Sequence, residues 1–325
     1  MLRTAGHRDQ SGFSLVELML ALALGIVVVT GIVQLFVGNS QTYRMLTGQA
    51  RMQENARFAL EFIAQAARSA GYYGCSLDRS NYVNGLGGGD WDSVPVEFDI
   101  TRVVRADGNR VIFHGTERPG QRLVEVLQPD GEPRVEAPGG DPGFEAGDEV
   151  VLANCEQGAL FRVSGIAPDG DEAVVQHGWT CAGSGYCASG NAERVLGLDG
   201  SFGPYTLSKL SRSYGEDSVV APLRTVAFYI EDGALMQQVN DDPPAELVEG
   251  VEALDVMYGI DTAPDDDVRR AGQYVSSPST EQWNDVVALR VAVTVNSRDA
   301  VTEDGEELQR TVSRTILLRN SDPEV

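Results

Sequence analysis

The N-terminal part of the chain is dominated by apolar residues. The segment 18–33 holds no charge, and Thr30 is its one polar residue. Its length suits a membrane-spanning helix, which we place at about 15–37. Glu17 stands at the head of this helix, where a carboxylate in lipid costs about 2.5–3.5 kcal/mol on insertion scales. Such an acid is rare unless it has a partner or a function.

A helical pattern continues beyond the apolar segment. Positions 39–70 contain no proline, and one face collects apolar residues at alternating steps of four and three. These are Met52, Ala56, Ala59, Ile63, Ala66 and Ala70. Arg57 and Glu61 lie four residues apart on the other side, a spacing that favours an ion pair. Gly71 is the expected stop, so the sequence predicts a helix over 13–71 whose second half packs under a globular head.

Beyond Cys75 the pattern changes to short alternating runs separated by turn residues. Strands are predicted at Val94–Ile100, Val103–Arg105, Val111–His114, Leu123–Leu127, Glu149–Ala153, Leu160–Ile166, Ala173–Gln176, Leu223–Ile230, Ala234–Val239, Glu246–Tyr258, Asp285–Val295 and Thr311–Leu318. The turns at 107–109 and 231–233 predict hairpins, and 81–93 and 128–147 predict loops.

The predicted fold class is therefore α+β, with a long N-terminal helix packed on a mainly antiparallel β head. The head spans 72–325. Residues 178–218 show little periodicity, which suggests a division into two lobes, 72–200 and 201–325.

Composition and charge narrow the function. The chain has 325 residues, 42% of them hydrophobic, and a net charge of −23. Residues 1–75 hold 6 Arg and 4 acidic residues, net +2, so the remaining 19 basic and 44 acidic residues give −25. A head with this charge is repelled by nucleic acid and by anionic lipid surfaces. Direct nucleic-acid binding is not expected.

The basic leader ends at Gly12, ahead of the apolar segment rather than behind it. A secretory signal is cut after its apolar core. A cut after Gly12 would instead remove residues 1–12 and leave the apolar helix on the mature chain. Phe13 would then be the first residue and Glu17 the fifth.

The stretch 12–18, which reads Gly-Phe-Ser-Leu-Val-Glu-Leu, resembles the processing motif of type IV pilins. The resemblance implies that a membrane prepilin peptidase cuts between Gly12 and Phe13 and methylates the new N-terminal amine of Phe13. It also implies that Glu17 neutralises the N-terminal amine of a neighbouring subunit in the fibre. An amine and a carboxylate in lipid stabilise each other only when they are close.

Further features resemble the PilW-type minor pilins. They are Ala-Gly-Tyr-Tyr-Gly-Cys at 70–75, Asn154-Cys155, the long β head, and Thr-Ile-Leu-Leu-Arg-Asn at 315–320. The resemblance implies a low-copy subunit, not an enzyme, that joins other minor pilins and the major pilin to prime assembly and cap the pilus tip. A large tip adhesin is a further optional partner. Twitching motility and adhesion are the implied processes.

The same resemblance implies a single pass through the inner membrane with the head in the periplasm, followed by transfer to the pilus tip at the cell surface. Two alternatives stay open. One is a J-type pseudopilin of a type II secretion system. The other is a signal-anchored extracytoplasmic binding protein or enzyme, which would need neither Gly12 nor Glu17.

Four cysteines lie beyond the apolar helix, where the basic leader places them outside the cytoplasm. Three pairings are possible, and we favour Cys181–Cys187 with Cys75–Cys155. A zinc site from Cys155, His177, Cys181 and Cys187 is the alternative, but it lacks the C-x2-C spacing of structural zinc sites.

No catalytic motif is recognisable, so no catalytic or cofactor-binding residue is predicted. The chain has three histidines, of which His7 belongs to the leader and His114 lies on a predicted strand, where a structural or exposed role suffices. There is no H-E-x-x-H, G-x-S-x-G or phosphate-binding loop.

A cluster of acids gives a second metal hypothesis. Asp261 and the run 265–267, with Asp241 and Asp242, carry carboxylates of the kind that calcium prefers. The order D-x-D-x-D-G is missing, and acid-rich loops are usually solvated. No metal is therefore predicted.

Overall fold

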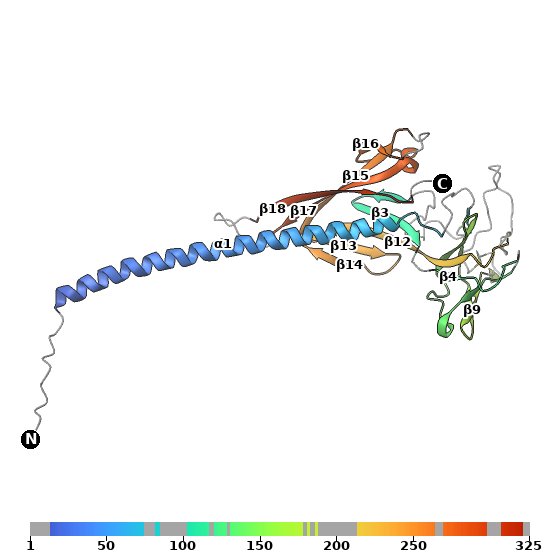
Figure 1. Ribbon diagram of the computed structural model, residues 1–325, viewed down its shortest axis with the longest axis horizontal. Coiled ribbons are helices and arrows are strands. Elements are labelled where there is room, and N and C mark those ends of the chain that lie inside the picture. Colours follow the sequence, from blue (N-terminus) through green and yellow to red (C-terminus); the bar gives the residue numbers. More distant parts are fainter. Residues whose placement is uncertain are drawn as a thin grey trace, which may run out of the picture. The chain divides into compact units, whose positions relative to one another are not determined.

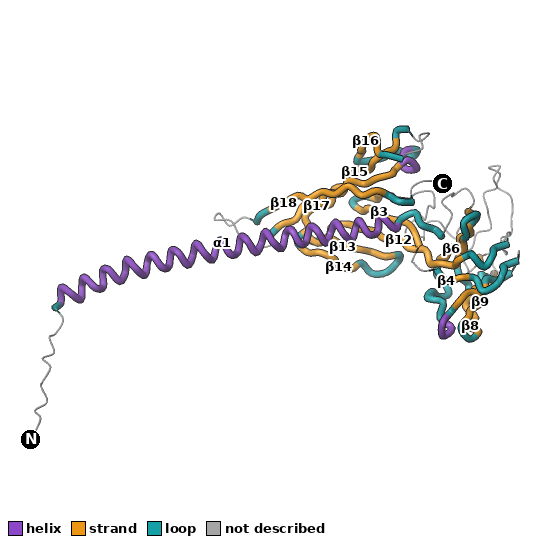
Figure 2. Tube along the Cα trace, viewed as in Figure 1, coloured by secondary structure: helices purple, strands orange, loops and turns teal. Residues whose placement is uncertain are grey.

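A computed structural model describes residues 14–74, 82–84, 103–116, 120–128, 131–177, 181–182, 186–187, 213–263, 269–297 and 307–320 (Figure 1). The chain divides into two compact units. The first unit comprises Met1–Gln53 and Asn296–Gln309, and the second unit comprises Glu54–Val295 and Arg310–Val325. The fold is α+β, as predicted, with one long N-terminal helix followed by mostly antiparallel strands (Figure 2).

Helix α1 runs from Leu15 to Ser69. Within the second unit it buries one apolar face, and Ala56, Ala59 and Ile63 lie on it as the spacing predicts. Further along, Ala67 is buried and Ala66 is only half-buried. The last predicted position, Ala70, is buried, so the predicted face is wrong by one residue at Ala66 alone.

The largest sheet has nine strands, and β12 is its central element (Figure 1). Its members are β1 (Tyr82–Asn84), β2 (Val104–Asp107), β3 (Arg110–Thr116), β4 (Gln121–Arg122), β6 (Glu149–Ala153), β7 (Gly158–Arg162), β12 (Val219–Glu231), β13 (Ala234–Val239) and β14 (Ala245–Glu249). β12 pairs antiparallel with β3, β4, β6 and β13. β1 pairs with β7 in parallel, whereas the other strand pairs of this sheet are antiparallel.

Three smaller sheets complete the described structure. One is β5 (Arg134–Glu136), β9 (Glu172–Gln176) and β8 (Gly165–Asp169), and another is the pair β10 (Cys181–Ala182) and β11 (Tyr186–Cys187). The last has the order β16 (Ala271–Val275), β15 (Val251–Asp261), β17 (Val286–Asn296) and β18 (Gln309–Leu317). Short 3-10 helices lie at η3 (Pro138–Gly140) and η4 (Gln282–Asp285).

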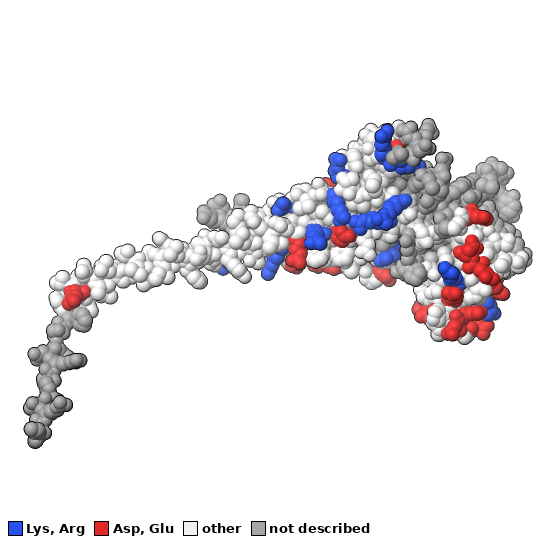
Figure 3. Space-filling model, viewed as in Figure 1, with Lys and Arg blue, Asp and Glu red and all other residues white. Residues whose placement is uncertain are grey.

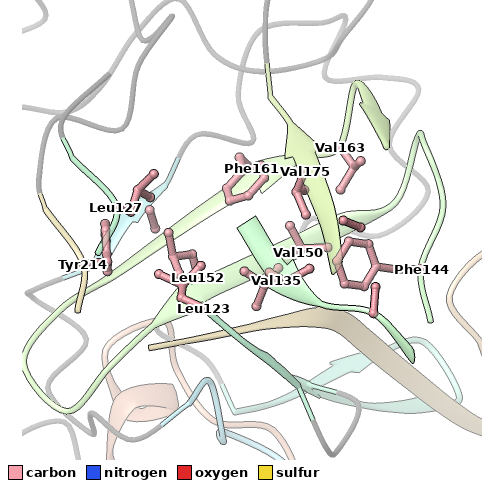
Figure 4. Close-up of a cluster of buried hydrophobic side chains, with 14 residues drawn as sticks. Leu123, Leu127, Val135, Phe144, Val150, Leu152, Phe161, Val163, Val175 and Tyr214 are labelled. Atoms are coloured by element: carbon pink, nitrogen blue, oxygen red, sulfur yellow. The ribbon is translucent and has the colours of Figure 1, made fainter. Parts of the chain in front are cut away.

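A core cluster lies where the large sheet meets the β5–β9–β8 sheet (Figure 4). Val135, Val150, Leu152 and Val175 are fully buried in it, and Phe161 adds an aromatic ring. Alternate positions along β9 are buried, as a strand with one face on the core requires. This packing stabilises the β-rich part of the second unit by removing apolar surface from water.

The structure confirms the predictions that rest on local turn signals. Both hairpins form, β2–β3 around 107–109 and β12–β13 around 231–233. Gly108 and Gly233 take the positive φ that these tight turns need. The strands predicted at 149–153 and 234–239 have the predicted bounds.

Two predicted strands are wrong because each is split between two sheets. The stretch 160–166 breaks after Arg162. Up to Arg162 it forms β7, which pairs with β6, and from Gly165 it forms β8, which pairs with β9. Between them the backbone N–H of Ser164 donates to the Gln176 carbonyl. The stretch 246–258 breaks at Gly250, whose φ of 71° few other residues adopt.

Other predictions erred on loops and edges. The stretch 123–127 is no strand; Leu123 and Leu127 make isolated bridges, and their apolar spacing reflects burial in the core. The predicted loop 128–147 contains β5, and the predicted loop 81–93 contains β1. β16 was not predicted. Val94–Ile100 lies outside the described residues.

Candidate assembly interface

The first part of α1 presents an apolar surface on all sides. Its large apolar side chains from Leu15 to Val37 have exposed fractions between 47% and 74%. The helix is long and apolar enough to cross a membrane, with a mean hydropathy of 2.6 over its most apolar window. Nothing in the described part of the chain covers these side chains. Lipid or other apolar helices can cover them.

Glu17 lies in the first turn of α1 and is exposed. The helix begins here because the Ser14 carbonyl accepts the Leu18 N–H at 3.0 Å. A carboxylate at this end also interacts favourably with the helix dipole. Gly12 and Phe13 lie outside the described residues, so the processing roles of Gly12 and Phe13 and the assembly role of Glu17 stay predictions.

The other end of α1 is held tightly to the sheet. Gly71 has φ +77°, and its N–H donates to the His114 carbonyl at 2.7 Å. A Cβ at Gly71 would lie 2.5 Å from the Asn320 backbone oxygen and 2.9 Å from Val103 Cγ2. Both the backbone conformation and the space therefore require glycine at the end of this helix.

The sequence features that resemble the PilW type meet at this point. Asn320, in the 315–320 feature, donates from Nδ2 to the Ala70 carbonyl at 2.9 Å. Gly74 lies so close to Ala153, next to Asn154-Cys155, that an added Cβ would approach the Ala153 side chain to 2.7 Å. Thr116 Oγ1 donates to the Tyr72 carbonyl at 3.0 Å. Features far apart in sequence thus form one attachment between helix and strands.

Glu61 joins α1 to β18. Its carboxylate accepts hydrogen bonds from Arg314 Nη1 at 2.6 Å and from Arg68 Nη1 at 3.3 Å. These bonds, that from Arg314 above all, lower the pKa of Glu61 below its ordinary value. The partner predicted from the i,i+4 spacing was Arg57, so that prediction was wrong. Two better-placed guanidinium groups take both carboxylate oxygens.

The structure describes the backbone of three of the four cysteines. Cys155 is disulfide-bonded, and Cys181 and Cys187 are directly opposite each other in the backbone register of β10 and β11. The side chains of Cys75, Cys181 and Cys187 are outside the described part, so the pairing stays a prediction.

Two residues of the metal hypotheses, His177 and Asp261, make contacts within the fold. His177 is buried, bonds the Gly131 carbonyl through Nε2 at 3.0 Å and packs edge-on against Phe161. Asp261 is buried and accepts backbone N–H groups of Ala263 and Arg270 at 3.0 and 3.4 Å. Among the described residues, no three His, Cys, Asp or Glu side chains are grouped to hold a metal. The run 265–267 lies outside them.

His114 has a structural position. It is buried on β3, and its Nδ1 lies 3.1 Å from Thr225 Oγ1 on β12. Its carbonyl accepts the Gly71 N–H described above. The strand position predicted from sequence is confirmed, and the side chain belongs to the attachment of the helix to the sheet.

Two family models match the chain. The Prokaryotic N-terminal methylation motif matches residues 7–33, and Type IV Pilus-assembly protein W matches residues 224–321. Both matches are consistent with a type IV pilus-related pilin. Within this class its resemblance is to the PilW-type minor pilins, as the sequence features predict. No curated protein matches the chain at a significant level.

One matched region includes the start of α1, and the other includes strands that hold its far end. The first includes Gly12, Phe13 and Glu17, and the second runs from β12 to β18 and includes Asn320. The pilin class implies a structural protein anchored in a membrane. It also implies contacts with the pilus assembly machinery and with other pilins.

Proposed function

We propose that the chain is a minor pilin that primes assembly of a type IV pilus and occupies its tip with other minor pilins. The observation that carries this proposal is the exposed apolar helix headed by Glu17 and fixed at its other end to a β-rich unit. A helix of this kind has unsatisfied apolar surface that other pilin helices can cover. The match to Type IV Pilus-assembly protein W supports the pilus over a secretion pseudopilus.

The proposed mechanism starts with removal of residues 1–12 by a prepilin peptidase. Phe13 then becomes the N-methylated first residue, and Glu17 pairs with the N-terminal amine of a neighbouring subunit. In lipid, this pairing is strongly favoured because neither charge is well solvated alone. It sets the axial register while the apolar helices pack side by side.

In this proposal the head, 72–325, faces the periplasm before assembly and the cell surface afterwards. The partners are the major pilin, other minor pilins and, optionally, a large tip adhesin. We also propose the disulfides Cys75–Cys155 and Cys181–Cys187, which suit an extracytoplasmic compartment. The force and energy for pilus assembly come from a separate ATPase. The implied processes are twitching motility and adhesion.

Substitution of Glu17 tests the mechanism. Glu17→Ala removes the carboxylate but not the cleavage motif, so we expect normal removal of the leader and loss of incorporation into sheared pili. Glu54→Ala, which removes an exposed acid further along α1, is the matched control and should incorporate normally. Immunoblots of membrane and pilus fractions measure both. Normal incorporation of Glu17→Ala would contradict the proposal.

A further inference from the structure

A pocket of about 550 Å³ lies between the last turns of α1 and the face of β12, within the second unit. β12 contributes alternate positions, which share one face of a strand. These are Val220, Pro222, Arg224 and Val226. The volume falls in the range of ligand sites, roughly 300–1,000 Å³. None of the described residues that line it is acidic, although the chain holds 48 Asp and Glu.

Arg224 gives this pocket a permanent positive charge. Its Nε is buried without a hydrogen-bond partner, and no described carboxylate forms an ion pair with it. Elsewhere in the second unit an arginine attracts several acids, as Arg134 does with Glu125, Asp169 and Glu172. Figure 3 shows acids gathered in that region, around β4 and β9. Arg224 therefore differs from Arg134 in having a cavity where its counter-charge would be.

We propose that the pocket binds the acidic side chain of an extended segment of another pilin subunit. One guanidinium balances one negative charge and can bond both oxygens of a carboxylate. A doubly charged phosphate would leave an uncompensated charge in a strongly acidic head. The ligand chemistry that fits the pocket is thus a single carboxylate.

The rest of the lining favours a peptide as the carrier of that carboxylate. Gln65, Gln121 and Gln237 line the pocket, and each amide offers both donors and an acceptor, as peptide groups do. On α1, Phe58 and Phe62 lie four residues apart with exposed fractions of 49% and 38%, and Phe62 lines the pocket. Neighbouring apolar side chains of the segment can pack on these two rings.

The test is calorimetric titration of the full chain in detergent with acetyl-Phe-Glu-Phe-amide and acetyl-Phe-Gln-Phe-amide. We expect the Glu peptide to bind at least about tenfold more tightly than the Gln peptide, and Arg224→Gln to remove that preference. Arg122→Gln is the matched control, because Arg122 is exposed on β4 and does not line the pocket. It should bind as the native chain does.

Two further variants keep the proposal testable if Arg224→Gln unfolds. Ala66→Met extends from α1 into the pocket and leaves Arg224 in place, so it should weaken binding of the Glu peptide. Arg224→Lys keeps the charge but not the two-pronged geometry and should bind with intermediate affinity. Equal binding of both peptides, or no binding by either at millimolar concentration, would overturn the proposal. The sugar carboxylate glucuronate serves as a ligand that carries the same charge without a peptide. If glucuronate binds through Arg224 while the Glu peptide binds no better than the Gln peptide, the proposal is also overturned.

The proposal rests on the proposed pilin function, but the two can fail separately. If Arg224→Gln is processed and enters pili as the native chain does and no peptide binds, the pocket proposal fails and the pilin function stands. If the leader is never removed while the Glu peptide binds through Arg224, the pilin function fails and the pocket remains a carboxylate site.

Discussion

Two stretches of α1 have opposite surroundings. Along 15–37 the large apolar side chains are exposed, whereas along 54–69 the residues Ala59, Ile63 and Ala67 are completely buried. The sequence already differs, since the first stretch is apolar on all sides and the second only on one face. The second stretch finds its apolar partners within the chain. No described residue covers the first stretch, and lipid or other apolar helices can do so.

The sharpest way to break this comparison is to shorten one isoleucine in each stretch. Ile63→Ala removes buried methylenes, so we expect the free energy of unfolding of the second unit to fall by about 2–5 kcal/mol. Ile26 is 66% exposed, so Ile26→Ala should change it by no more than about 0.5 kcal/mol. Denaturant unfolding of the full chain in detergent measures both. Equal losses would show that the two stretches do not differ as described.

Glycines offer a second comparison, between Gly25 in the exposed stretch and Gly71 just beyond the end of the buried one. Gly71→Ala forces a positive φ on alanine and a clash with Asn320, so we expect the free energy of unfolding to fall by about 2–4 kcal/mol. Gly25 has no atom within 4 Å of an added Cβ, so Gly25→Ala should not lower the free energy of unfolding.

Gly108→Ala separates the two contributions at Gly71. Gly108 has φ +59° and open space around it, so its substitution should cost only the strain, about 1–2 kcal/mol. If Gly71→Ala costs no more than Gly108→Ala, the close approach to Asn320 contributes nothing to stability.

The smallest expected effect concerns pH. Because Arg314 and Arg68 lower the pKa of Glu61, the folded state favours the ionised carboxylate. The stabilisation is present above the unfolded-state pKa, near 4.5, and is lost as pH falls through the lower folded-state value. Glu61→Gln should therefore weaken the pH dependence of unfolding below about pH 4.5. If the stability of the native chain and that of Glu61→Gln depend on pH in the same way, Glu61 does not make its hydrogen bonds to Arg314 and Arg68 in solution.

Sequence reasoning succeeded where the signal is local. The apolar stretch of α1, the turns at 107–109 and 231–233, and the alternation along β17 each specify their element within a few residues. The processing motif is also local, since Gly12, Phe13 and Glu17 need no fold to be recognised. The match at 7–33 supports that part of the interpretation.

Sequence reasoning failed where partners are distant. Glu61 and Arg314 are 253 positions apart, so the nearer Arg57 was the expected partner. The break at Gly250 depends on β14 and β15 joining different sheets. The pocket around Arg224 combines residues from α1, β3, β4, β12 and β13, and no single stretch indicates it.

The most direct test of the central claim is the N-terminal mass of the protein purified from membranes with and without an active prepilin peptidase. We predict a mature chain that begins at methylated Phe13 only when the peptidase is active. Residues 1–12 should remain attached in Gly12→Val even with the peptidase. A native chain that keeps residues 1–12 in both strains would contradict the pilin account and leave Glu17 without its proposed partner.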